Sequence, residues 1–199
     1  AGLTTANTVR GGTISVTAGT ATSTTQAEGG SAMVHGGRGQ SFTGGSLSLV
    51  TGEGTATSSG HIVLRSVNSG TTGVSGSLYF STGTTSSGGS GSVSLFTGAA
   101  TNGEGGDVLV SVGKSKTDTG GDIYAIAGDS YDASGGAISL TTGEGTDTSS
   151  GSFIVRTVNA GGVGVSGALS FTTGTTSSGT SGMVTIATGS ATNGKAGNM

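Results

Sequence analysis

The chain has 199 residues, of which 44 are glycine, 9% are charged and 4% are aromatic, and it contains neither proline nor cysteine. This composition lacks the bulky apolar residues of an ordinary globular core, excludes disulfides and cysteine-based sites, and shows no Gly-X-Y triplet of a collagen helix. The formal net charge of −3 and the scattered lysines and arginines argue against nucleic acid as a partner, and no run of about 18 apolar residues predicts a membrane span.

Residues 1–45 form the less regular beginning of a repetitive sequence. Residues 31–45 fit one repeat of 15 residues, and residues 13–30 fit a repeat with an insertion of three residues. The chain begins and ends inside a repeat, so we interpret residues 1–199 as one continuous domain and as a window on a longer repeat protein.

From residue 46 onward the repeat is regular, and it is nested in a longer one. Six repeats make a superunit of 91 residues at 46–136, and a partial second superunit follows at 137–199. Residues 46–106 and 137–197 are identical at 38 of 61 positions. Self-similarity with a short, fixed period indicates a repeat architecture in which each unit stacks on its neighbours.

Each repeat opens with a segment that predicts a β-strand with one buried face. If the first residue of the repeat is position 1, then positions 2 and 4 are apolar and positions 1, 3 and 5 are mostly polar, and this alternation is typical of a half-buried strand. The predicted core consists of Leu47, Leu49, Ile62, Leu64, Leu78, Phe80, Val93, Leu95, Val108, Val110, Ile123, Ile138, Leu140, Phe153, Val155, Leu169, Phe171, Val184 and Ile186.

Glycine recurs at position 7 of nearly every repeat and at the last position of every repeat, and it suits corners that need positive φ or close approach of the backbone. The corner glycines are Gly52, Gly60, Gly76, Gly83, Gly91, Gly98, Gly106, Gly113, Gly121, Gly128, Gly136, Gly143, Gly151, Gly167, Gly174, Gly182, Gly189 and Gly197. Strand and corners together predict an all-β chain, a single parallel β-solenoid with about 15 residues per coil, a flattened, thin core and coils about 4.8 Å apart. The alternative is a disordered Gly/Ser/Thr tail.

Two repeats, at residues 61–76 and 152–167, contain one extra residue. In both, a Val-Asn pair that ends at Asn68 or Asn159 replaces the first corner glycine. One extra residue predicts a bulge, and asparagine tolerates left-handed backbone, so we expect this marker to recur once per superunit.

Catalytic chemistry has little support in the sequence. The only histidines are His35 and His61, and the second superunit has other residues at the matching positions. No nucleophile elbow, zinc-binding helix or phosphate-binding loop occurs, so we expect no enzymatic activity and no organic cofactor.

Acidic residues offer one candidate metal site. Stacking of repeats would align four carboxylates along one edge, those of Asp129, Asp132, Glu144 and Asp147. Carboxylates at strand spacing repel unless a cation such as Ca²⁺ bridges them. The alternative is a ladder of opposite charges, because Lys114 precedes Asp129 by one repeat and Arg38 precedes Glu53 in the same way. Asp107 and Asp122 form a similar pair of like charges.

The phrases TG, SSG and GG bracket short strands such as SLSL, VSLF and AISL. They resemble the Gly/Ser/Thr-rich tandem β-solenoid repeats of extracellular fibres, adhesins and phage or virus fibre proteins. The resemblance implies a structural subunit of an extracellular or cell-surface filament, joined to other copies end to end or by covalent continuation. It leaves open the stalk of an adhesin or carbohydrate-binding protein, an ice-binding role for the threonines, and polysaccharide or O-linked glycans as partners.

Overall fold

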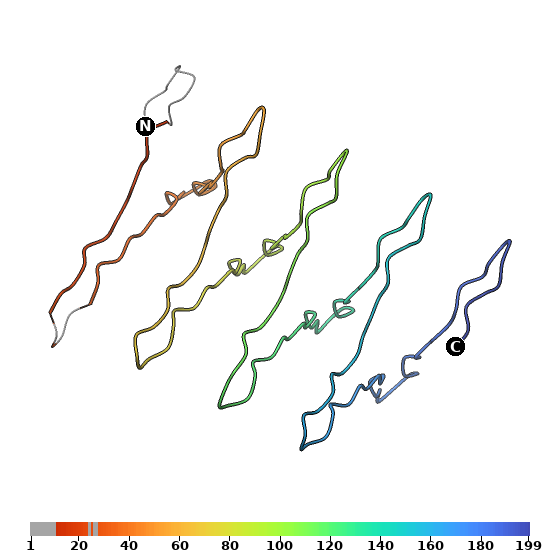
Figure 1. The fold of residues 1–199 in the computed structure, drawn as a ribbon. Coiled ribbons are helices and arrows are strands. Elements are labelled where there is room, and N and C mark those ends of the chain that lie inside the picture. Colours follow the sequence, from red (N-terminus) through yellow and green to blue (C-terminus); the bar gives the residue numbers. More distant parts are fainter. Residues whose placement is uncertain (1–10, 24, 26–27) are drawn as a thin grey trace. The chain divides into compact units, whose positions relative to one another are not determined.

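The computed structural model describes residues 11–23, 25 and 28–199. Within these ranges the chain forms no helix and no β-strand, and Figure 1 shows it as extended segments joined by narrow loops. The predicted single-chain β-solenoid is therefore wrong. The chain divides into two units, Ala1–Gly106 and Asp107–Met199, and their boundary falls between two repeats.

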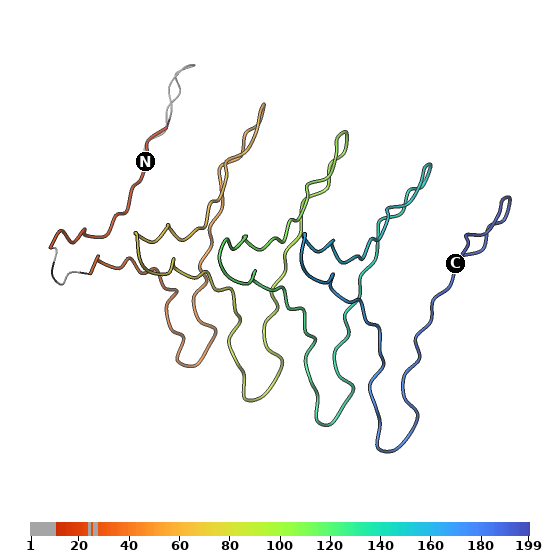
Figure 2. The same ribbon diagram turned by 60° about the horizontal axis from the view of Figure 1, so that its bottom comes forward.

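The repeat nevertheless has a regular local structure, with two parts that we call the arm and the loop. The arm comprises positions 1–6 and is extended, whereas the loop runs from position 7 to the last glycine. Each repeat from residue 31 onward bends once, at positions 10–12, as at residues 55–57 and 146–148. In the two longer repeats the bend moves by one position, to residues 71–73 and 162–164. Figure 2 shows the alternation of arms and narrow loops from a second direction.

A backbone hydrogen bond closes several loops between their two corner glycines. The N–H of Gly60 donates to the carbonyl of Gly52 at 3.1 Å, and the N–H of Gly151 donates to that of Gly143 at 3.0 Å. Equivalent bonds close the loops that end at Gly30, Gly45 and Gly136, the first of which contains the insertion of three residues. Where the structure describes the chain, all backbone hydrogen bonds are of this kind, so the arms are not paired with one another.

The two corner glycines differ in their surroundings. A Cβ atom on Gly60 would lie 3.2 Å from Cβ of Thr51, and one on Gly121 would lie 2.7 Å from Cγ1 of Val112. The last glycine of the repeat thus lies against the side chain at position 6 and leaves little room for a side chain of its own. A Cβ atom on the first corner glycine, as at Gly52, would meet nothing within 4 Å.

Positive φ angles occur in the bends, away from both corners. They are found at Gly73 and Gly164, with φ of 132° and 138°, and at Gly88 and Gly179, with φ of 112° and 118°. Among the described residues no other type has positive φ, so the left-handed backbone expected at Asn68 and Asn159 is absent there. Glycine takes this conformation in the longer repeats because it has no Cβ to clash with the carbonyl.

None of the predicted core residues is buried. The accessible surface of the chain is 19970 Å², whereas a folded monomer of 18.6 kDa exposes about 8,200 Å². The predicted core side chains are 48–78% exposed. They are Leu47, Leu49, Ile62, Leu64, Leu78, Phe80, Val93, Leu95, Val108, Val110, Ile123, Ile138, Leu140, Phe153, Val155, Leu169, Phe171, Val184 and Ile186.

The physical reason for the correction lies in the loop. A flattened coil requires the second half of each repeat to lie opposite the strand and cover its apolar face. In the repeats that have a bond of the Gly60–Gly52 type, the second half folds back on its own corner and does not cover positions 2 and 4. The exposed fraction of the side chains still alternates along the arm, since Val63 is 73% exposed whereas its neighbours Ile62 and Leu64 are 55% and 54% exposed.

Candidate functional site

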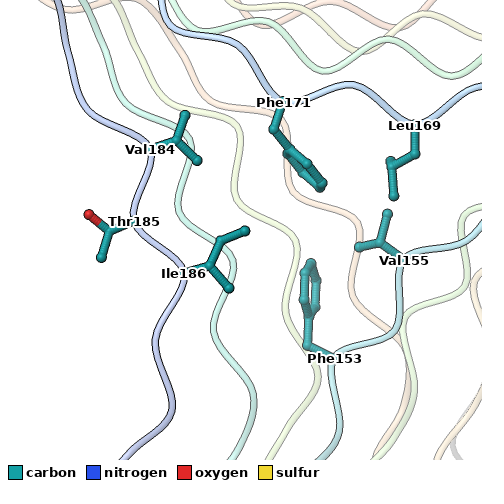
Figure 3. A pocket seen from close by; sticks show the side chains of 7 residues that line it. All are labelled: Phe153, Val155, Leu169, Phe171, Val184, Thr185 and Ile186. Atoms are coloured by element: carbon teal, nitrogen blue, oxygen red, sulfur yellow. The ribbon is translucent and has the colours of Figure 1, made fainter. Parts of the chain in front are cut away.

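Three successive arms of the second unit face a common apolar space. The arms begin at residues 152, 168 and 183, and each contributes its side chains at positions 2 and 4. They enclose a hollow of about 420 Å³, lined by Phe153, Val155, Leu169, Phe171, Val184, Thr185 and Ile186. In Figure 3 the apolar side chains of the three arms point toward one another, and Thr185 is directed away from them.

This hollow explains the alternation that the sequence shows. In these three repeats, positions 2 and 4 face a common apolar space that belongs to three repeats together and not to one flattened coil. The alternation within one repeat does not reveal this grouping. A signal for it exists, because a superunit of six repeats is two groups of three.

The hollow is apolar and open to solvent. Its six apolar side chains remain 48–73% exposed, and no titratable group lines it. Full burial of a Val, Leu, Ile or Phe side chain stabilises a protein by about 1.5–3 kcal/mol relative to exposure. The site can therefore bind another apolar surface, and it has no group for acid-base or nucleophilic chemistry.

The same residue pattern recurs in the first superunit. The residues 91 positions earlier are again apolar, namely Ile62, Leu64, Leu78, Phe80, Val93 and Leu95. Conservative replacements such as Phe153 for Ile62 keep the apolar character while they change the shape. The apolar face is thus a property of the repeat, present along the chain from residue 46.

The arms also carry unpaired backbone groups along their edges. All backbone hydrogen bonds of the described ranges lie at loop closures, so the N–H and C=O groups of the arms have no backbone partner within these ranges. An extended segment with free edges and an apolar face is a template for pairing with another strand. Another extended strand could therefore satisfy both the backbone groups and the apolar side chains of the arm.

In some loops, a side-chain hydroxyl forms a hydrogen bond with a backbone group of the same loop. The hydroxyl of Ser130 accepts a hydrogen bond from the N–H of Ala133 at 3.0 Å, and Ser115 does the same for Asp118. The hydroxyl of Thr176 donates to the carbonyl of Ser178 at 3.1 Å. In these three repeats the bond lies at a bend that the serine or threonine directly precedes.

A second hollow, of about 380 Å³, lies at the first corner of a longer repeat. It is lined by the four consecutive residues Arg156, Thr157, Val158 and Asn159. No other segment contributes to it, so it brings together no set of groups from different parts of the chain. This corner supplies one cationic side chain and no recognisable binding constellation.

The predicted calcium ligands are not brought together. No group of three or more His, Asp or Glu side chains with metal-binding geometry occurs in the described part of the chain, and the carboxylates of Asp129, Asp132, Glu144 and Asp147 are exposed. The two histidines, His35 and His61, are exposed as well. Calcium binding stays a prediction.

Comparison with protein-family models, curated proteins and solved structures finds no match. In the residues that the structure describes, no helix has the length and hydropathy to cross a bilayer. Inferences about function therefore depend on the geometry of the arms and loops.

Proposed function

We propose that the chain is a structural subunit of an extracellular or cell-surface filament, whose partner is further copies of the same chain. One observation carries the proposal: every regular repeat presents an extended arm with an apolar face, and in the described part of the chain no side chain of these faces is buried. A repeat protein of this kind gains its stability from contacts between neighbouring units. Here the missing neighbours are supplied by assembly.

The size of the exposed surface supports self-association. The accessible surface exceeds that of a folded monomer of the same mass by more than 10,000 Å² on an order-of-magnitude basis. Stable interfaces bury about 1,200–2,000 Å² in total, and obligate ones up to about 5,000 Å². The chain thus has far more surface to bury than one ordinary interface provides, and contacts repeated along its length meet that need.

Composition favours a structural role over a catalytic one. Serine, threonine and glycine dominate the loops, which are closed locally by backbone and hydroxyl hydrogen bonds. The hollow between the arms holds no titratable group. These features suit display of a polar loop surface around an apolar interior, and the resemblance to fibre and surface repeats suggests an extracellular location.

Negative-stain microscopy combined with sedimentation tests the proposal. Purified chain at increasing concentration should form uniform fibres that lengthen, with little material of the 18.6 kDa chain mass remaining. Short rods of fixed length at all concentrations would instead favour the stalk of an adhesin. Monomeric particles at high concentration would contradict both.

A further inference from the structure

The arms lack partners on both edges, and this defines the form of the assembly. Three successive arms surround one hollow in the second unit, so the chain makes one turn in three repeats. In the described part of the chain no backbone hydrogen bond joins one arm to another. If the turn continues, the gap between successive turns is bordered by free N–H and C=O groups of the arms, and the arms around the hollow direct an apolar face inward.

Resting on the proposed function, we propose that two further copies of this chain wind into these gaps, so that three copies share one apolar interior with threefold symmetry. The threefold axis follows from the three sides of the turn, because closed symmetric assemblies use identical contacts in every copy. Each arm then pairs with arms of the other two copies through its backbone. The side chains at positions 2 and 4 of all copies fill the shared interior.

Threefold symmetry also fixes which repeats are neighbours. On one side of the assembly, let the first arm be repeat n of the first copy. The next arm along that side is repeat n + 1 of the second copy, and the arm after it is repeat n + 2 of the third copy. The fourth arm is repeat n + 3 of the first copy, one turn further along. A stagger of one repeat thus relates neighbouring arms, and all of them are parallel.

This stagger brings two pairs of opposite charges together, and it also places the like charges of Asp129 and Glu144, and of Asp107 and Asp122, side by side. Lys114 occupies position 8 of its repeat and Asp129 the same position of the next, and Arg38 and Glu53 have the same relation. Within one chain, successive repeats occupy different sides of the turn. Between copies with a one-repeat stagger, the opposite charges of each pair become neighbours, whereas a stagger of zero would place Lys114 next to Lys114 of a second copy.

Engineered cysteines test the stagger directly, since the chain has none of its own. Ser170 and Thr185 occupy position 3 of successive repeats, between residues that line the hollow, and Thr185 is directed away from it. Neighbouring strands lie about 4.8 Å apart, within the Cα separation of about 4.4–6.8 Å that a disulfide spans. The substitutions Ser170→Cys and Thr185→Cys are therefore made singly and together, and the assembled protein is oxidised.

We expect the double variant to give a covalent species of three times the 18.6 kDa chain mass on a non-reducing gel. An equimolar mixture of the two single variants, unfolded and reassembled together, should give covalent pairs that contain one chain of each. Each single variant alone should give none. Sedimentation of the unmodified chain should show a species of three chains as the smallest assembled form.

Other results would overturn the threefold arrangement. Pairs formed by Ser170→Cys alone would mean that equal repeats are neighbours, a bond within one chain would mean that its own repeats stack, and no bond in any variant would exclude the contact. Microscopy of the same samples tests the filament separately. Fibres without these cross-links would leave the filament proposal standing, and cross-linked rods that never lengthen would contradict the filament alone.

Discussion

The arm and the loop of each repeat differ in how their backbone N–H and C=O groups are satisfied. The loop closes on itself, with a bond such as that from Gly151 to Gly143 and with a hydroxyl across the bend, as at Ser130. The arm has neither kind of bond and presents an apolar face to solvent. The loop is thus locally determined, whereas the arm depends on partners outside its own repeat.

In the proposed assembly, this difference predicts which changes have the largest effect. Changes in the arm would act on contacts between copies and should affect assembly as a whole. Changes in the loop act within one repeat and should have a smaller, local effect. Charge changes at the loop surface should have the smallest effect, because solvent screens them.

The largest effect is expected for a charge on the apolar face of the arm. Leu140→Asp places a carboxylate at position 4, where assembly would remove it from water at a cost of several kcal/mol. We expect loss of fibres by microscopy and of the assembled species by sedimentation. Thr141→Asp, one residue further and on the other face, is the control and should assemble. Normal assembly of Leu140→Asp would show that this face is not the contact.

A smaller loss is expected for a side chain inside the loop. The Cβ atom of Gly145→Ala would collide with the carbonyl oxygen of Ser149 across the loop, and the backbone must shift to admit it. Such overpacking costs about 1–3 kcal/mol, measurable as a lower Tm of the assembled protein. Gly143→Ala, where the Cβ meets nothing within 4 Å, is the control. Equal effects of the two substitutions would contradict the loop geometry.

Reversal of one surface charge should have a modest effect. Lys114→Glu would place like charges side by side between staggered copies and destabilise each contact by about 0.2–1 kcal/mol. The double variant Lys114→Glu with Asp129→Lys should restore the Tm, and added salt should reduce the difference. Lys116→Glu changes the net charge equally, but the matching residue of the next repeat is Tyr131, so it is the control. Failure of the double variant to recover would argue against the stagger.

Chelation of divalent cations should have no measurable effect on the Tm. The residues 91 positions before the four carboxylates are Arg38, Ser41, Glu53 and Ala56, so the matching repeats lack three of the four. A fall of many degrees with chelator, reversed by Ca²⁺, would show that Asp129, Asp132, Glu144 and Asp147 hold an ion in the assembled protein. The same measurement on Asp132→Asn would then locate the site.

Part of the local structure follows directly from the sequence. The alternation of Phe153, Ile154 and Val155 predicts a face, and the structure leaves the middle side chain the most exposed of the three. The recurrent last glycine predicts close approach, and a Cβ on Gly60 would be 3.2 Å from Thr51. Asn68 was a misleading signal, because Gly73 in the same repeat provides the left-handed residue at lower steric cost.

The candidate site could be predicted only in part. The apolar identity of Leu169 and Phe171 is visible in the alternation, but their meeting with Phe153 and Val184 is not. Periodicity within a strand shows which side chains share a face and does not show what that face meets. The acidic cluster stays a prediction, since alignment in sequence brings carboxylates together only where successive repeats lie directly next to one another, and the described part of the single chain does not place them so.

The sequence by itself determines the repeat, its arm with one apolar face and its glycine corners, because these depend on steric and hydropathic preferences over a few residues. Only the tertiary structure decides that the loop closes on its own corner and that three arms, not one coil, surround the apolar space. The reason is that a 15-residue period fits a flattened coil and a third of a larger turn equally well. The direction in which the chain leaves each closed loop distinguishes the two, and this direction depends on backbone geometry that the pattern of apolar residues does not encode.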